Sequence, residues 1–250
     1  MTPRVDYNRM AAVYDCGRGL PLEALEAWRA ALSRYLPAET GMPVLDLGSG
    51  TGRFSNALAE WFDADVIGVE PAEGMRREAQ RKITHPRVAY IGGEAERIPL
   101  RDGSCDSAWL STVIHHIGDL PGCARELRRV LRPQGRVLIR SSFPGRHDDI
   151  MVFRFFPATK EIAERFPTVE ATVKAFASAG FRMEALESVS QVLAPSLPAF
   201  CERVRVRADS ALDALSDDDF ARGMEALEKA AADEMTPTPV VDRLDLLVLR

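Results

Sequence analysis

The 250-residue sequence lacks a long apolar run, and its first ten residues contain no apolar signal region. The longest apolar candidates, such as residues 244–249, are only as long as a strand, whereas a membrane-spanning helix needs about 20 apolar residues. A secretory signal peptide would also require an apolar region near the N-terminus. We therefore expect a cytoplasmic protein without a membrane partner.

Cysteine is scarce, and the four cysteines are far apart with no CxxC pair: Cys16, Cys105, Cys123 and Cys201. This spacing argues against a disulfide framework and against a zinc site, and it fits a reducing cytosol. We expect Cys16 to behave as a small packed hydrophobic residue. An excess of basic charge is also absent, since the net charge is −5. We therefore expect no nucleic-acid partner.

The remaining composition is that of a globular protein, with 46% hydrophobic and 28% charged residues. Short apolar runs alternate with segments of helical spacing, which predicts right-handed βαβ units and a parallel sheet. A helix over 120–131 is expected to be stopped by Pro133 and Gly135. The other expected helices are 21–36, 54–62 and 72–82, and the expected strands are 44–47, 65–69, 87–91, 105–110 and 136–140.

The C-terminal part of the sequence has a different pattern. Thr168 is expected to cap a helix that ends at Gly180. Two late strands are expected at 181–192 and 240–249.

Residues 193–239, between those two strands, are expected to form a helical hairpin. Residues 203–207 alternate like a strand, but apolar residues keep helical spacing from Leu197 to Leu215 and therefore favour a helix. Ser216, with Asp219 three residues later, is typical of a capping box at the start of a second helix.

A glycine-rich loop follows the first expected strand. Gly48 and Gly50 lack a Cβ, so the backbone can approach a ligand closely there. Free N–H groups at the start of the following helix favour a polar or anionic group. A tight turn without a ligand is the alternative. The third glycine, Gly52, comes one residue early for the dinucleotide fingerprint, which disfavours an NAD-dependent dehydrogenase.

An acid at the end of the second strand strengthens the ligand-binding interpretation. Glu70 lies 22 residues after Gly48. A carboxylate at this place can accept both ribose hydroxyls of a nucleoside, although a solvated strand-end carboxylate is the alternative.

With these motifs the chain resembles the class I S-adenosylmethionine-dependent methyltransferases over roughly residues 7–141. Within them it is similar to the small-molecule branch typified by ubiquinone and menaquinone biosynthesis. The resemblance implies S-adenosylmethionine as the cofactor. It also implies an α/β fold: a doubly wound, Rossmann-like sheet of seven strands, mostly parallel with an antiparallel last strand, to which we add the inserted helical cap.

The resemblance also implies cofactor-binding roles for individual residues. Those of the first motif cradle the methionine moiety: Asp46, Gly48, Ser49 and Gly50. Glu70 binds the ribose. The segment that packs on adenine runs from Pro71 to Met75, with Met75 as the apolar contact.

Further matches complete the implied cofactor site. Glu94, where most relatives carry Asp, and the Ala95 N–H would read the adenine edge, while Ser111 matches the exit of the fourth strand. Tyr14 and Arg18 resemble the segment that closes over the cofactor, and Arg18 is the candidate partner of the methionine carboxylate because a guanidinium forks onto a carboxylate. Gln134 stands where glycine is usual.

Methyl transfer from a sulfonium is an in-line displacement that needs no metal, so positioning is the main contribution of the protein. His115 and His116 follow the fourth strand and are candidate bases for an acceptor that must lose a proton. Adjacent residues are not expected to point inward together, and the pair could instead only order this strand exit. His147 is expected to be a solvated loop residue.

Acceptor specificity is expected to come from segments added to the sheet core. Five phenylalanines between residues 142 and 167 could wall an apolar pocket or only bury this segment against the hairpin: Phe143, Phe153, Phe155, Phe156 and Phe166. Arg203, Arg205 and Arg207 could attract an acidic substrate, but a solvated helix face is the expected interpretation.

The sequence therefore predicts one methyltransferase domain over 1–250 that acts on a small-molecule acceptor through an O, N or C nucleophile, as a monomer or homodimer. Two alternatives stay open: a related enzyme that keeps the cofactor but catalyses another reaction, and a catalytically silent binding protein. The expected sheet core is 44–141, 168–192 and 240–250, and the expected cap segments are 1–43, 142–167 and 193–239.

Overall fold

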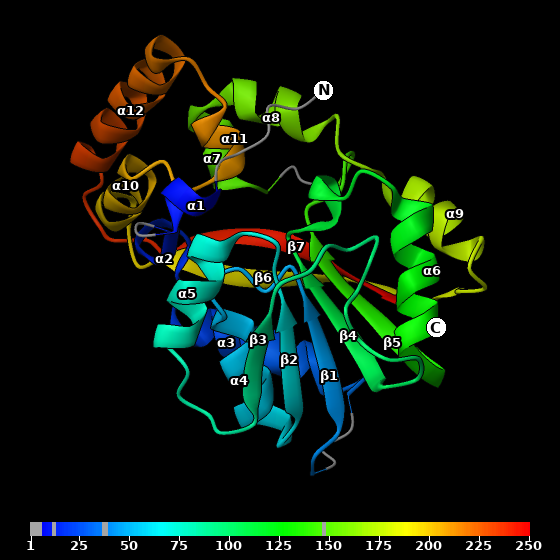
Figure 1. The fold of residues 1–250 in the computed structure, drawn as a ribbon. Coiled ribbons are helices and arrows are strands. Elements are labelled where there is room, and N and C mark those ends of the chain that lie inside the picture. The colour runs from blue at the N-terminus through cyan, green and yellow to red at the C-terminus, as the bar shows by residue number, and fades with distance from the viewer. Residues whose placement is uncertain (1–6, 12–13, 37–39, 147–148) are drawn as a thin grey trace.

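A seven-stranded sheet forms the centre of the computed structural model, which describes residues 7–11, 14–36, 40–146 and 149–250. The strand order is β3-β2-β1-β4-β5-β7-β6, and β7 runs antiparallel to both neighbours, whereas the pairs from β3 to β5 are parallel (Figure 1). This confirms the expected fold class. The strands are β1 (Pro43–Leu47), β2 (Asp65–Val69), β3 (Val88–Ile91), β4 (Cys105–Ser111), β5 (Leu131–Ser141), β6 (Met183–Ala194) and β7 (Val240–Leu249).

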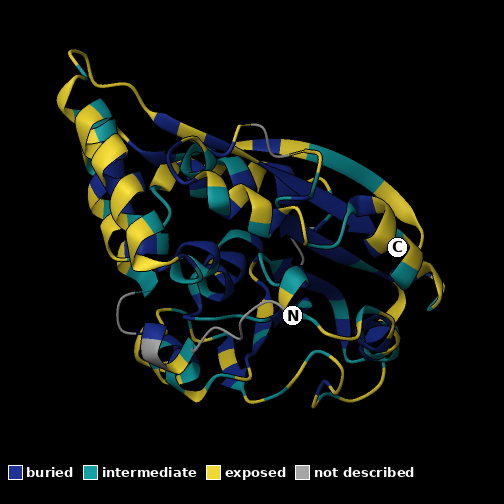
Figure 2. Cartoon of the chain, turned by 90° about the horizontal axis from the view of Figure 1, so that it is seen from above, coloured by how far each residue is buried: buried dark blue, intermediate teal, exposed yellow. Residues whose placement is uncertain are grey.

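Helices cover both faces of this sheet. Side chains alternate along each strand, so in β1 Val44 joins one apolar cluster while Leu45 and Leu47 join the cluster on the other face. Figure 2 shows the sheet as a buried band among helices whose outer sides are exposed. The first cluster includes residues of α3 (Leu22–Leu32), α4 (Arg53–Phe62) and α5 (Glu73–Arg81), and the second includes residues of α6 (Leu120–Val130) and α9 (Val169–Ala177).

Side-chain caps begin several of the helices where the sequence predicts them. Thr168 accepts a hydrogen bond from the Ala171 N–H at 3.1 Å, and Ser216 accepts one from the Asp219 N–H at 3.0 Å. Gly180 has a φ of +85°, as expected just beyond a helix end.

A cap of further helices lies beyond one end of the sheet (Figure 1). Helices form within 193–239 as expected, and α12 packs against α10 and α7. The cap helices are α1 (Tyr7–Met10), α2 (Tyr14–Arg18), α7 (Met151–Phe155), α8 (Pro157–Ala163), α10 (Leu197–Arg205), α11 (Ser210–Asp213) and α12 (Asp217–Ala232), and the 3₁₀-helix η1 (Ile114–His116) follows β4.

Two expectations about element ends are wrong. The helix that begins at Leu197 ends at Arg205, because Arg207 adopts a φ of +48° and Asp209 caps the separate helix α11. Pro133 and Gly135 do not stop α6 either, since β5 already begins at Leu131.

Gln134 has a φ of +74°. Glycine adopts this conformation at little cost in free energy, whereas other residues are strained by it. This accounts for the glycine that is usual at this place.

Candidate functional site

The glycine loop lies at the carboxyl ends of β1 and β4, where the strand order reverses direction along the chain. Ligands of doubly wound sheets bind at such a switch point. A cavity of about 30 Å³ lies here. It brings together six of the expected cofactor residues, and its lining is Tyr14, Asp46, Gly48, Ser49, Gly50, Thr51, Arg53, Phe54 and Ser111.

The three glycines of the loop all have positive φ, at +73° for Gly48, +56° for Gly50 and +80° for Gly52. A Cβ on Gly52 would lie 2.0 Å from the Tyr90 hydroxyl, and a Cβ on Gly48 would lie 2.5 Å from Val113 Cγ2. A Cβ on Gly50 would meet no atom within 4 Å. The loop therefore packs tightly at two of its glycines and leaves open space at the third.

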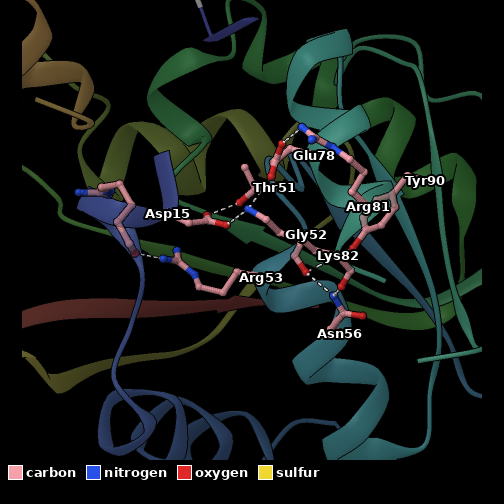
Figure 3. A network of polar contacts seen from close by, with 10 residues as sticks. Asp15, Thr51, Gly52, Arg53, Asn56, Glu78, Arg81, Lys82 and Tyr90 are labelled. Atoms are coloured by element: carbon pink, nitrogen blue, oxygen red, sulfur yellow. Dashed lines mark hydrogen bonds and ion pairs between the residues drawn. The ribbon is translucent and has the colours of Figure 1, made fainter. Parts of the chain in front are cut away.

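Polar contacts hold α2 over this loop (Figure 3). The Thr51 hydroxyl donates to Asp15 Oδ1 at 2.6 Å, and Lys82 Nζ donates to Asp15 Oδ2 at 2.5 Å. Arg53 donates to the carbonyl oxygen of Arg18. The segment that was expected to close over the cofactor is thus bound to the loop that was expected to hold it.

Two buried carboxyl groups lie under the loop. Glu70 accepts hydrogen bonds from the N–H groups of Gly50 at 3.0 Å and Ala72 at 2.9 Å. Burial raises its pKa, and these two N–H donors oppose the shift. Asp46 accepts a 2.6 Å hydrogen bond from the Ser55 hydroxyl. Burial raises the pKa of Asp46 to about 7, and the bond from Ser55 works in the opposite direction.

The residues expected at the adenine lie outside this cavity. Met75 is buried and packs with Met10 of α1, while Pro71 and Glu94 are exposed and Ala95 is half-buried. Their adenine contacts stay a prediction.

A larger cavity of about 130 Å³ adjoins the first one and shares Tyr14 and Arg53 with it. It reaches across the carboxyl ends of β4, β5 and β6 to the cap helices. Both histidines line it, which corrects the expectation that only one could. The reason is local geometry: η1 is a helical turn rather than a strand, and the two rings lie 4.0 Å apart.

The two histidines have different surroundings. The His115 ring stacks on Phe166 at 4.1 Å, and its buried Nδ1 has no hydrogen-bond partner among the described residues. Burial lowers the pKa of His115 well below its usual value, and His116 lowers it further. His116 is more exposed, and its Nε2 lies 2.6 Å from the Tyr7 hydroxyl. Partial burial of its ring also lowers the pKa of His116, to about 4, although Asp209 opposes the shift.

Arg18 lines the larger cavity and forms an ion pair with Asp209. Arg53 lines both cavities and is therefore a second candidate partner of the cofactor carboxylate. This residue was not among those predicted from the sequence.

One residue in the lining of the larger cavity has a strained backbone conformation. Thr112, which follows β4, has a φ of +53°. A β-branched residue rarely adopts this conformation, and such residues cluster at functional sites.

Of the five phenylalanines between residues 142 and 167, some line the larger cavity and the others pack in apolar clusters. Phe153 and Phe166 line the larger cavity, Phe155 and Phe156 pack in the cluster that contains the hairpin, and Phe143 is in the sheet core.

The three arginines of the hairpin also separate. Arg203 lines the cavity, whereas Arg205 pairs with Glu228 and Arg207 pairs with Asp217. Cys16 is exposed, so its interpretation as a packed residue is wrong. His147 lies outside the described residues.

Sequence reasoning also missed Arg140, Gln191 and Asp242, which line the larger cavity and are buried. A signal was present, since Arg140 and Asp242 are charged residues within apolar strand segments.

Within the described ranges, no group of three or more His, Cys, Asp or Glu side chains could hold a metal ion. In the same part of the chain, no helix combines the length and apolarity that crossing a bilayer requires.

Comparison with known proteins agrees with this geometry. Residues 45–139 match a family model described as a methyltransferase domain. The matched segment contains the glycine loop and Glu70 and is similar to that domain family. The resemblance inferred from the glycine loop and Glu70 is thereby confirmed, and the cofactor of this class is S-adenosylmethionine.

Two curated relatives share this domain. A biotin biosynthesis bifunctional protein, BioHC, of Cellvibrio japonicus is 38% identical over 141 residues, which are 56% of this chain and 27% of the relative. A demethylmenaquinone methyltransferase of Beutenbergia cavernae is 36% identical over 112 residues, 45% of each chain. The chain thus spans less than half the length of these relatives.

The fold likeness extends further than the sequence likeness. The crystal structure of a protein of Anabaena variabilis, described as a methyltransferase from an antibiotic biosynthesis pathway, superposes with a TM-score of 0.70 at 23% identity. The match covers 88% of this chain and 96% of the other.

Proposed function

We propose that this protein transfers the methyl group of S-adenosylmethionine to a small-molecule acceptor in the larger cavity. The observation that carries this proposal is the junction of the two cavities at Tyr14 and Arg53. A cofactor bound on the glycine loop and an acceptor bound in the larger cavity would meet at this junction, with no other part of the chain between them. The added helices act as the acceptor-binding part of a single domain, and a cytosolic location remains part of the proposal.

The residues of the glycine loop fit the cofactor on two observations. The Cβ position of Gly50 is open space, and the buried Ser49 hydroxyl has no hydrogen-bond partner among the described residues. When bound, S-adenosylmethionine supplies a sulfonium-activated methyl group. Glu70 uses two acceptor positions for backbone N–H groups. A carboxylate offers about four, which leaves two for the ribose hydroxyls.

The chain contributes position and a hydrogen-bond acceptor. Bringing nucleophile and methyl carbon into line lowers the barrier without covalent catalysis. His115 is neutral at physiological pH because burial lowers its pKa. With its ring proton on Nε2, Nδ1 accepts a hydrogen bond from an O–H or N–H of the acceptor and orients that group, and it would take the proton that this group loses as it becomes methylated.

Calorimetric titration of the full chain with S-adenosylmethionine tests the cofactor site, using Glu70→Gln and the matched control Glu73→Gln. Glu73 is exposed on α5 and pairs with Arg77. Charged hydrogen bonds contribute roughly 1.5–3 kcal/mol each, so Glu70→Gln should weaken binding by at least about tenfold, and Glu73→Gln should not. Equal binding by both variants would contradict the ribose role of Glu70.

Incubation with methyl-labelled S-adenosylmethionine and a pool of small metabolites tests the reaction. Label in the small-molecule fraction, with S-adenosylhomocysteine formed in equal amount, supports methyl transfer. Cofactor binding with product but no transferred label would indicate another reaction. Binding without any product would indicate a silent binding protein.

A further inference from the structure

The wall of the larger cavity carries more positive than negative charge. Its charged lining residues are four arginines and two aspartates: Arg18, Arg53, Arg140, Arg203, Asp209 and Asp242. S-adenosylmethionine does not balance this excess, because its sulfonium and ammonium groups outweigh its one carboxylate. A third component with negative charge would complete the site.

Arg140 is the most deeply buried of the cations that lack a carboxylate partner in the described part of the chain, and the Trp28 and Phe54 rings lie beside its guanidinium. It is 2% exposed, and its hydrogen-bond partners are neutral: Ser111 Oγ at 3.2 Å and Gln191 Oε1 at 2.7 Å. Its buried Nε has no partner among the described residues, and no carboxylate of the described chain pairs with it. A guanidinium does not lose its proton in proteins, and a buried charge is costly unless it is paired.

The other charges of the wall do not relieve this excess. Asp209 already forms an ion pair with Arg18. Arg203 donates to the carbonyl oxygens of Gly19 and Leu193 rather than to an acid. Asp242 accepts a hydrogen bond from the Met151 N–H at 2.8 Å. Burial raises the pKa of Asp242 to about 6, so this group stays mostly ionised at neutral pH, and the two aspartates together offset only two of the four arginines.

Apolar and aromatic surface lies in the same cavity. Phe153, Phe166, Phe200, Ile150 and Val152 are among its lining residues. The site can therefore hold a molecule with an apolar or aromatic body and one anionic end.

We propose that the methyl acceptor carries an oxyanion, a carboxylate or a phosphate, that Arg140 binds in the larger cavity, with Arg203 adding positive charge from the cap. This inference rests on the proposed methyl transfer at the same site. The oxyanion supplies the missing counter-ion of Arg140 and holds the acceptor against the junction with the cofactor cavity. An arginine-bound oxyanion is a weakened nucleophile, so the methylated atom lies elsewhere on the molecule.

Binding to protein saturated with S-adenosylhomocysteine tests this inference. The probes are 4-hydroxybenzoate, 4-hydroxyphenylacetate and 4-hydroxycinnamate, each beside its uncharged amide, with phenyl phosphate as the phosphate arm. We expect at least one oxyanion to bind roughly tenfold or more tightly than its uncharged partner, because hydrogen bonds to charged groups are the strong ones. Preference for a carboxylate or for phenyl phosphate identifies which oxyanion the site takes.

Variants assign that preference to residues. Arg140→Gln should abolish it, Arg140→Lys should retain part of it, and Arg203→Gln should reduce it. Arg136→Gln is the matched control, since Arg136 pairs with Glu184 outside the cavity. Thermal unfolding of each variant without ligand checks its fold. If Arg140→Gln does not fold, Arg203→Gln and the salt dependence of oxyanion binding decide instead.

Three results would overturn the inference. Equal affinity of the oxyanions and their uncharged partners is the first, and an unchanged preference in the folded variants is the second. The third is a loss of S-adenosylhomocysteine affinity in Arg140→Gln, which would assign this arginine to the cofactor carboxylate. Failure of the wild-type protein to bind S-adenosylhomocysteine would instead contradict the proposed function itself.

Discussion

Alanine substitution should separate the roles of two glycines in the same loop. Gly50 and Gly52 both have positive φ, at +56° and +80°. Holding an L-residue in this region costs roughly 1–2 kcal/mol. Gly50→Ala should cost about that much stability, because its Cβ meets nothing within 4 Å. Gly52→Ala adds a Cβ that lies 2.0 Å from the buried Tyr90 hydroxyl. Displacing Tyr90 costs a further ~1–3 kcal/mol, as other overpacked cores do.

Cofactor affinity should show the opposite order, with the larger loss in Gly50→Ala than in Gly52→Ala. The open space at Gly50 lies in the glycine-loop cavity, where a methyl group would compete with the cofactor. Gly103→Ala is the matched control, since Gly103 has a φ of +59° and an equally open Cβ position but lies in a turn away from the site. Urea unfolding without cofactor should give Gly50→Ala and Gly103→Ala similar losses, and Gly52→Ala a larger one.

Calorimetry with S-adenosylmethionine then completes the test. Gly50→Ala should weaken binding at least about tenfold, a loss of about 1.4 kcal/mol, while Gly103→Ala should leave binding unchanged. If Gly50→Ala bound the cofactor like the wild type, or lost as much stability as Gly52→Ala, the assignment of open and packed glycines would be refuted.

Three further outcomes follow from pKa shifts and packing. Burial raises the pKa of Asp46 from 3.8 to about 7. The contribution of its protonated form to the free energy of unfolding is therefore fully present below about pH 4 and falls by up to about 4 kcal/mol as the pH rises to 7. Unfolding of Asp46→Asn across this pH range should lack that loss. His115 has a lowered pKa, so its protonation on unfolding destabilises the fold as pH falls below about 6.5, and His115→Asn should reduce this acid sensitivity in thermal unfolding. A Cβ on Gly223 would lie 2.2 Å from the buried Phe156 ring, so Gly223→Ala should loosen α12 and raise its hydrogen exchange while leaving that of the sheet unchanged.

The sheet and the glycine loop could be predicted because their information is local. Residues 44–54 contain a buried strand, the turn glycines and a helix start in one continuous stretch. Asp65–Val69 and Val240–Leu249 are strands over the residues expected from their apolar runs. The position of Glu70 relative to Gly48 then indicated the cofactor, because both follow neighbouring parallel strands and therefore lie at the same edge.

The larger cavity could not be predicted in the same way, because its lining depends on contacts between distant parts of the chain. Arg140 meets Gln191, and Arg18 meets Asp209, across long sequence separations. No local pattern signals either pair. The break after Arg205 was also missed, because hydrophobic spacing continues through the left-handed Arg207. The Arg207 side chain donates to the carbonyls of Leu212 and Leu215, and hydrophobic spacing does not signal these contacts.

The two cavities differ in how freely their walls can change. The smaller one is made mainly by residues of one loop, and its tight glycines leave little room for substitution. The larger one is made by side chains from the ends of strands and from separate cap helices. Their shared wall is Tyr14 of α2 and Arg53 of α4, and α2 is bound to the loop through Asp15 and Thr51. Changes in the cap helices other than α2 can therefore alter acceptor specificity without disturbing the loop, whereas changes in α2 affect both cavities. The acceptor of this protein is consequently best sought through Arg140 and Arg203, which lie on the larger cavity alone.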